Sequence, residues 1–387
     1  MKPSSGSPAL LAIGGLIALA SAMGIGRFIY TPILPFMVED LGLSKSNAGL
    51  IASANFLGYL AGAIVAAAVR LPGSQRGWML AALTASALTT AAMGWPRSIA
   101  AFLMLRFAGG VASAYVLVLA SSLVLHRLSA SGSGTLSAVH FAGVGVGIVL
   151  SALLTCVLGM AGLGWPSMWI CSGAIAYCSA PVVAALIPSA APEEMVSPAG
   201  AEAASHGRLK LLALAYGLFG FGYVITATFI VVIVRGSPDA SPLEPLFWLV
   251  LGLAAIPSVA FWVAVGRRCG VVGAFAIACL AEAVGVYASV TWPGLEGLLA
   301  ASVLVGGTFM GLTALGLIAA NDLAPTDGRR WFGILTSAFG LGQIVGPIVA
   351  GYGFDLTGSF FLPSMLAVAA LCLGALLALA IVRGRPA

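Results

Sequence analysis

Long apolar segments follow one another along the whole of this 387-residue chain, each about 20 residues or longer. A segment of that length can cross the roughly 30 Å hydrocarbon core of a bilayer as an α-helix. Charged residues make up only 7% of the chain, too few to cover the surface of a soluble domain. The sequence therefore predicts an all-α membrane protein. We expect twelve membrane-spanning helices, over residues 9–37, 48–69, 77–95, 99–125, 134–160, 165–187, 209–234, 245–266, 270–292, 297–320, 331–353 and 360–382.

Lys and Arg are unevenly distributed over the predicted loops. With the N-terminus in the cytoplasm, twelve of the seventeen fall on the cytoplasmic side, three on the opposite side and two within helices. Because basic residues favour cytoplasmic loops, this predicts that both termini are cytoplasmic, in a bacterial-type inner membrane. The net charge of +5 is then a signal of topology, and no basic stripe indicates a nucleic-acid partner. The first apolar segment is too long for a signal peptide, so we expect it to be retained.

One polar stretch divides the chain. Residues 188 to 207 read PSAAPEEMVSPAGAEAASHG, a composition typical of a flexible linker. We predict a first six-helix bundle over residues 1–187, a cytoplasmic linker over 188–208 and a second six-helix bundle over 209–387. Six helices return the chain to its starting side, so the two bundles would be parallel repeats. Glycine patterns recur between them at offsets of 196 to 199 residues: Gly24 and Gly26 as Gly220 and Gly222, Gly109 and Gly110 as Gly306 and Gly307, Gly143 and Gly147 as Gly342 and Gly346.

Small residues spaced four apart allow helix backbones to approach closely. The pattern occurs at Gly58 and Gly62 as well as in the fifth and eleventh predicted helices. Two interpretations stay open: static helix packing, or smooth faces on which the two halves move against each other. The candidate gating or helix-interface residues are Gly143, Gly147, Gly342, Gly346 and Pro347.

Four stretches carry a family resemblance: GRFIYTPILP in the first helix, RFAGGVASAYV in the fourth, HFAGVGVGIVLS in the fifth and FGLGQIVGPIVAGYGFDLTGSF in the eleventh. Over essentially its whole length the chain resembles the major facilitator superfamily, and more narrowly its YbfB/YjiJ-type branch. The resemblance implies a central cavity between two six-helix bundles, with alternating access. Arg106, in R-x-x-G-G-x-A-x-A, matches the superfamily's helix-4 arginine motif.

The chain also departs from the superfamily pattern. The loop after the second helix, VRLPGSQRG, keeps Arg70 and Arg76 but lacks the usual acidic residue. The fifth helix lacks the proline of the antiporter motif, although Gly346-Pro347 occurs in the eleventh. The motifs therefore do not support an assignment as an antiporter.

Arg27 and Arg106 are the two arginines within predicted helices. At 1.5 Å per residue they lie roughly 14 Å and 11 Å from the outer boundary. No Asp or Glu occurs between Asp40 and Glu193, so the first half holds two buried cations and no acidic partner. Backbone carbonyls, the Tyr30 hydroxyl and water would compensate them in a structural interpretation. In a functional one an anionic substrate supplies the charge, with Arg27 as its chief anchor.

Aromatic and amide side chains near these arginines, including Phe28, would enclose an organic substrate, although each alone is more often plain packing. The candidate substrate-binding residues are Arg27, Tyr30, Asn55, Tyr59, Arg106, Tyr115, Tyr223 and Gln343.

His140 is the candidate proton-coupling residue, because histidine is the side chain whose ordinary pKa lies near neutrality. A packed histidine bonded to a hydroxyl is an equal alternative. For Glu282, pairing with a nearby polar group is the preferred interpretation.

The leading hypothesis is secondary active transport of a small organic anion, a carboxylate, by proton symport or anion exchange. The alternative is proton-driven efflux of lipophilic drugs or metabolites, which commonly uses a carboxylate within the membrane. No paired nucleophile, metal-ligand cluster or phosphate loop indicates an enzyme. We expect no cofactor and no metal, a small-molecule substrate, protons as a candidate second substrate, and a monomer in the lipid bilayer.

Overall fold

The computed structural model describes residues 7–68, 72–189, 206–292, 294–324 and 328–383. Within these ranges the chain consists of helices and turns, with no strand. The helices are α1 Pro8–Leu19, the π-helical turn η1 Ala20–Ile25, α2 Tyr30–Leu41, α3 Lys45–Ala68, α4 Gln75–Ala92, α5 Ile99–Ala130, the 3-10 turn η2 Gly134–Leu136, α6 Ser137–Met160, α7 Trp165–Leu186, α8 His206–Arg235, the 3-10 turn η3 Ser241–Leu243, α9 Glu244–Cys269, α10 Val271–Thr291, α11 Leu295–Leu323, α12 Gly328–Thr357 and α13 Phe361–Arg383.

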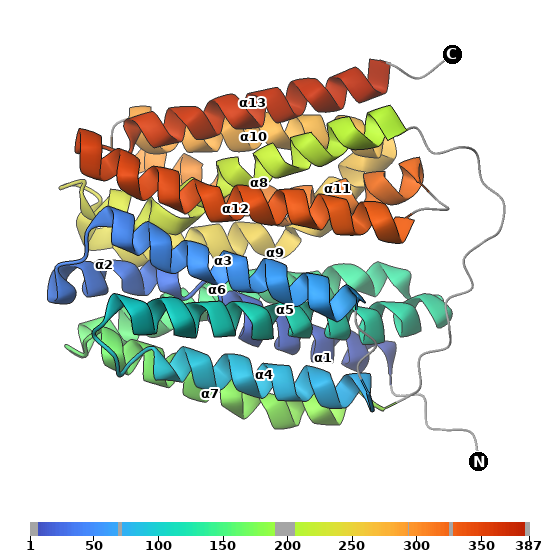
Figure 1. Ribbon diagram of the computed structural model, residues 1–387, viewed down its shortest axis with the longest axis horizontal. Helices are drawn as coiled ribbons and strands as arrows, with labels where there is room; N and C mark the ends of the chain where they lie inside the picture. The colour runs from blue at the N-terminus through green and yellow to red at the C-terminus, as the bar shows by residue number, and fades with distance from the viewer. Residues whose placement is uncertain (1–6, 69–71, 190–205, 293, 325–327, 384–387) are drawn as a thin grey trace.

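In the described part of the chain, eleven helical segments are long and apolar enough to cross a membrane, and α1, η1 and α2 together make the first of them. The remaining predicted crossing, over residues 77–95, corresponds to α4, whose 18 residues are less apolar because they include Gln75 and Arg76 as well as four hydroxyl side chains. It nonetheless runs beside α5 and α7 like the other helices (Figure 1). The all-α membrane architecture is therefore confirmed.

The helices run side by side in two groups (Figure 1). Helices α1 to α7 pack mainly with one another, as do α8 to α13, and the groups meet where α3 packs against α12 and α6 against α9. We call these groups the first half and the second half. The start of α1, the end of α7, the start of α8 and the end of α13 lie at one end of the molecule, which we call the connection end; the opposite end is the distal end.

The predicted linker, 188–208, lies mostly outside the described residues. Helix α7 ends at Leu186 before it, and α8 begins at His206, three residues ahead of the predicted second bundle. The division into domains at this linker stays a prediction.

The candidate interface glycines lie between helices of the same half. A Cβ atom built on Gly143 would lie 2.2 Å from the carbonyl oxygen of Leu16 in α1, and one on Gly147 would lie 2.2 Å from that of Ala20. In the second half, Cβ atoms on Gly342 and Gly346 would meet α8 at 2.2 Å and 2.4 Å. These equivalent glycines thus let α6 pack on the first crossing and α12 on α8.

Other small residues line the contacts between the halves. A Cβ atom on Gly49 would lie 2.1 Å from the carbonyl oxygen of Pro347, so α3 and α12 touch backbone to backbone at this proline. The Ser53 hydroxyl donates to the carbonyl of Ile344 at 2.7 Å nearby. Between α6 and α9, the Trp248 indole donates to the Ser151 hydroxyl at 2.9 Å.

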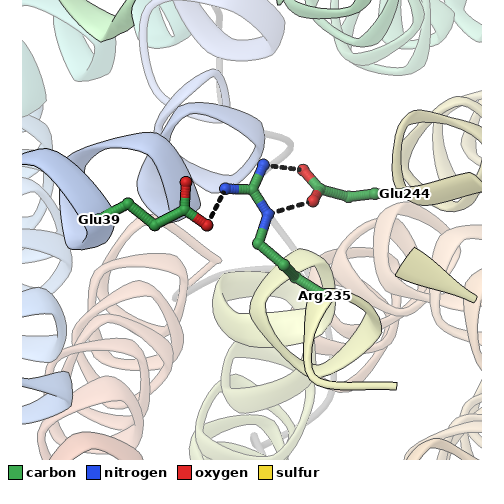
Figure 2. Close-up of polar contacts among 3 residues, drawn as sticks. All are labelled: Glu39, Arg235 and Glu244. Carbon is green, nitrogen blue, oxygen red and sulfur yellow. Dashed lines mark hydrogen bonds and ion pairs between the residues drawn. The ribbon is translucent and has the colours of Figure 1, made fainter. Parts of the chain in front are cut away.

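Polar contacts also join the halves at the distal end. Arg235 in α8 binds both carboxylate oxygens of Glu244 in α9 through Nε and Nη2, and its Nη1 lies 2.8 Å from Glu39 in α2 (Figure 2). The Asp355 carboxylate in α12 accepts from the backbone N–H groups of Lys45 and Ser46 at the start of α3. A cavity of about 580 Å³ lies beside these groups, bordered among others by Glu39, Lys45 and Arg235.

Arg235 has two unequal partners. The Glu244 side chain is 9% exposed and belongs to the same half, whereas the Glu39 side chain is 64% exposed and belongs to the other half. Exposed ion pairs contribute about 0–1 kcal/mol, and loss of one partner of a buried pair costs several kcal/mol. The ion pair that crosses between the halves is therefore the weaker one.

This difference predicts unequal effects of two matched substitutions. Glu244→Gln should reduce the free energy of unfolding by about 2 kcal/mol, because Arg235 loses its buried fork-to-fork partner. Glu39→Gln should cost about 0.5 kcal/mol. Thermal unfolding of both purified variants in the same detergent measures the effects. A melting temperature lowered as much by Glu39→Gln as by Glu244→Gln would contradict this picture of the distal end.

Candidate functional site

The first membrane crossing is interrupted just before Arg27. The turn η1 has π-helical hydrogen bonds, from the N–H of Gly26 to the carbonyl of Ser21 at 2.8 Å and from Phe28 to Met23 at 3.1 Å. Regular helix resumes at Tyr30. Glycine suits this segment, since a Cβ atom on Gly24 would lie 2.3 Å from the Cα atom of Gly147. π-Helical turns inside α-helices often occur at functional sites.

Arg106 reaches this break from α5. Its Nη1 donates to the carbonyl of Gly26 at 3.2 Å, and its Nη2 donates to the carbonyl of Arg27 at 3.0 Å. The guanidinium also faces the rings of Tyr30 and Trp169, with centroids 5.1 Å and 5.9 Å away. Arg106 is thus bound by backbone carbonyls of the interrupted helix, the geometry that the structural interpretation requires.

Three other candidate substrate-binding residues make their contacts within the first half. The Asn55 amide donates to the carbonyl of Arg106 at 2.9 Å, and the Tyr30 hydroxyl donates to the carbonyl of Ala48 at 2.9 Å. Tyr115 is half-buried beside the apolar cluster that contains Val116 and Met79. The Asn55 hydrogen bond therefore joins α3 to α5, and the Tyr30 hydrogen bond joins α2 to α3.

Arg27 lies where the two halves meet. Its Nη2 donates to the side-chain oxygen of Gln343 in α12 at 2.9 Å, and the Gln343 amide in turn contacts the Tyr223 hydroxyl in α8. The Arg27 guanidinium faces three aromatic rings of the first half, with centroids at 4.1 Å for Tyr59, 4.7 Å for Phe56 and 5.5 Å for Phe28. Only 3% of Arg27 is exposed, and its Nε has no hydrogen-bond partner among the described residues. The structure therefore brings together Arg27, Tyr59, Tyr223 and Gln343.

No carboxylate of the described residues balances these two cations. Among the described residues, neither Arg27 nor Arg106 forms an ion pair. A guanidinium keeps its charge in proteins, and a desolvated contact with an aromatic ring contributes about 2 kcal/mol without neutralising it. An anion that entered beside Arg27 would gain two charge-assisted donors from one guanidinium edge. The arrangement therefore offers one guanidinium edge whose Nε donor has no partner among the described residues and whose Nη2 donor is bonded to a neutral amide oxygen.

His140 lies within the first half. Its Nε2 is 3.0 Å from the Ser121 hydroxyl, its ring is fully buried, and its Nδ1 has no partner among the described residues. Gly15 of α1 makes room for it, because a Cβ atom there would lie 2.2 Å from Nδ1. A hydrogen bond to a hydroxyl is what we expect of a histidine that only packs within the first half. A proton-coupling role for His140 stays a prediction.

Glu282 lies between α10 and α11. One carboxylate oxygen accepts from the Thr308 hydroxyl at 3.0 Å, and the other has no partner among the described residues. The carboxyl group is fully buried. No group of three or more His, Cys, Asp or Glu side chains in the described part of the chain could hold a metal ion.

Sequence reasoning missed several residues of the site. Phe56 lies next to Asn55 and one helical turn before Tyr59, so the helical period could have identified it. Trp169, and Trp248 and Phe309 of the second half, carry no signal that separates them from other apolar side chains. Their positions follow only from how the helices cross.

The geometry of Arg106 predicts a structural effect. Arg106→Lys keeps the charge but loses the planar fork that spans two carbonyls, so thermal stability should fall by about 2 kcal/mol. Arg97→Lys is the matched control, because Arg97 pairs with Asp40 at 3.4 Å and its side chain is 68% exposed. Equal melting temperatures of the two variants would contradict the carbonyl-anchoring role.

Comparison with known proteins assigns the chain to a family. The model of the family described as "Uncharacterised MFS-type transporter YbfB" matches residues 19–379. The crystal structure of the nucleoside transporter NupG is similar, with a TM-score of 0.70 and 15% identity over 98% of this chain and 99% of that one. A bacterial homologue of the human lysosomal transporter Spinster, crystallised in an inward-facing and unoccupied conformation, has a TM-score of 0.70 and 14% identity over all of both chains.

At these identities the two structures show the fold alone. No curated protein matches the sequence. The family model spans nearly the whole chain, and the fold neighbours are transporters. The chain therefore belongs to the YbfB-type family of the major facilitator superfamily and is a membrane transporter rather than an enzyme.

Proposed function

We propose that this transporter moves a small organic anion, a carboxylate, across the inner membrane by alternating access. Both termini and the connection end then face the cytoplasm, as the distribution of Lys and Arg favours. The cavity at the distal end is the outer vestibule. The protein acts as a monomer, and transport is coupled to proton symport or to anion exchange.

The observation that carries the proposal is the environment of Arg27. A charge buried to this extent is normally paired, and here its partners are an amide and three aromatic rings. The Nε and Nη2 donors lie on the same edge of the guanidinium. Nε is free, and Nη2 is held by the neutral Gln343 oxygen. A carboxylate that replaced this oxygen would accept both N–H groups in the bidentate geometry that arginine favours.

Exchange of Gln343 for substrate would also connect binding to movement. In the structure, Arg27 of the first half donates to Gln343 of the second, which in turn contacts Tyr223. A bound anion would release this connection and change the contact between the halves. At the distal end the exposed Glu39–Arg235 pair offers little resistance to opening. His140 is the candidate residue for proton coupling.

Substitution of Arg27 tests the proposal. Arg27→Gln should weaken carboxylate binding by roughly 2 kcal/mol or more, about thirtyfold, while the protein remains folded. Arg27→Lys should restore only part of the affinity, because the ammonium lacks the fork. The probes are benzoate and heptanoate, each compared with its uncharged amide. Ligand-induced shifts in melting temperature report binding to the folded protein.

Arg97→Gln is the control, since Arg97 lies exposed at the distal end. Normal carboxylate affinity together with reduced stability of Arg27→Gln would refute the anchoring role. Binding of lipophilic cations but no preference for carboxylates over their amides would favour the alternative, proton-driven efflux of lipophilic compounds.

A further inference from the structure

Helix α10 carries one acidic side chain, Glu282, in the middle of its length. The carboxyl group is fully buried against α11, and ionisable groups at this depth of a membrane-spanning helix usually have a function. The Lys, Arg, Asp, Glu and His side chains of the neighbouring helices α8, α9, α11 and α13 all lie within five residues of a helix end. These helices therefore bring no cation to face Glu282.

The titratable groups near Glu282 are thiols and a phenol, which are ordinarily uncharged at neutral pH. Cys279, one turn earlier in α10, interacts with Glu282 and with Cys372 of α13. Tyr223 of α8 is within electrostatic reach of both Glu282 and Arg27. An ionised Glu282 would thus be a buried charge without a counter-charge. Unlike an arginine, a carboxylate can avoid this state by taking up a proton.

The hydrogen bonds around Thr308 support a protonated carboxyl group. The Thr308 hydroxyl oxygen lies 2.6 Å from the carbonyl oxygen of Leu304, and 3.0 Å from one carboxyl oxygen of Glu282. A hydroxyl has one proton to donate, and threonines in helices commonly donate it to the carbonyl four residues earlier. With that proton on Leu304, the contact at 3.0 Å needs a proton from Glu282. The second carboxyl oxygen, which has no partner among the described residues, is then a neutral carbonyl oxygen.

Helix α11 connects this carboxyl group to the Arg27 site. Thr308 directly precedes Phe309, whose ring stacks on Tyr223 with centroids 5.7 Å apart. Tyr223 contacts Gln343, the side chain that accepts from Arg27. A change at the carboxyl group can therefore reach the Arg27 site through neighbouring side chains.

A side chain from α9 enters α11 at the same turn. The Ser258 hydroxyl donates to the carbonyl of Gly307 at 2.8 Å and accepts from the N–H of Gly311 at 2.9 Å. In a regular α-helix these two backbone groups would pair with each other. Helices bend where a side chain enters their hydrogen-bond ladder, so the turn that carries Thr308 is a point at which α11 can bend.

We propose that Glu282 is a proton-binding site of the second half, which takes up one proton from water together with the anion and returns it to water when the anion leaves. A negative charge on Glu282 would repel an anion at Arg27, and protonation removes this repulsion, so proton and anion favour each other's binding. The proposal rests on the proposed anion transport. It selects proton symport over anion exchange, and it adds Glu282 to the candidate His140 of the first half.

Infrared spectroscopy of the purified, full-length protein tests the protonation without a ligand. At neutral pH the wild-type spectrum should contain a neutral-carboxyl C=O band that is absent from Glu282→Gln and retained in the control Glu296→Gln, whose side chain is exposed. Because glutamine resembles a neutral carboxyl group in shape, Glu282→Gln should keep nearly the wild-type melting temperature. Identical carboxyl bands in wild type and Glu282→Gln, or a large loss of stability in this variant, would overturn the proposal.

Calorimetric titration with benzoate tests the coupling. Between about pH 7 and about pH 9.5 benzoate stays ionised and an ordinary histidine is largely neutral. Across this range the wild-type affinity should fall about tenfold or more, because Glu282 loses its proton. Glu282→Gln should keep a nearly constant affinity, whereas His140→Gln and Glu296→Gln should show the wild-type decline.

A decline that persists in Glu282→Gln, or a constant affinity in the wild type, would overturn the coupling and leave anion binding intact. If benzoate bound no more tightly than benzamide at any pH, the proposed function would fail and the coupling with it. The infrared band separates these failures, because it reports the proton on Glu282 whether or not an anion binds.

Discussion

Two buried guanidinium groups, with no acidic partner in the part of the chain that the structure describes, determine the organisation of the centre of this protein. The charge on Arg27 and on Arg106 cannot be removed by loss of a proton, so it must be compensated by whatever surrounds it. The two arginines receive different compensation. Arg106 takes two backbone carbonyls, whereas Arg27 takes a neutral amide and aromatic faces. Both guanidiniums keep an Nε without a partner among the described residues, and they differ in that Arg106 binds carbonyls of its own half whereas Arg27 binds Gln343 of the second half.

The interruption of the first membrane crossing places the two arginines in these different surroundings. The π-helical turn before Arg27 turns the carbonyls of Gly26 and Arg27 toward Arg106, and the same turn positions the Arg27 side chain at the contact between the halves. The close approach of Gly24 to Gly147 lets α6 pack directly against the turn. One local irregularity therefore anchors α5 and presents Arg27 to Gln343 and Tyr223.

Much of the fold could be predicted from the sequence, because hydrocarbon length and hydropathy constrain a membrane chain strongly. The sequence alone indicated the apolar segments, the similar depth of Arg27 and Arg106, and the lack of acidic partners. The partner of each arginine was not, since carbonyl anchoring depends on a helix break that has no clear sequence signal. The glycine pattern indicated close packing but not its location, and Gly143 and Gly346 pack within their halves while Gly49 lies between them. The aromatic cluster of Phe28, Tyr223 and Phe309 next to Arg27 arises from the crossing of helices far apart in sequence, so Phe309 was hidden among other apolar residues.

The central claim is that an anionic group completes the site at Arg27. A structure determined with 4-bromobenzoate tests it most directly, because anomalous scattering locates the bromine independently of the protein model. We expect the carboxylate of the ligand on Nε and Nη2 of Arg27, with Gln343 displaced and the bromine within the contact between the two halves. Density for the ligand elsewhere, with the Arg27–Gln343 hydrogen bond intact, would contradict it.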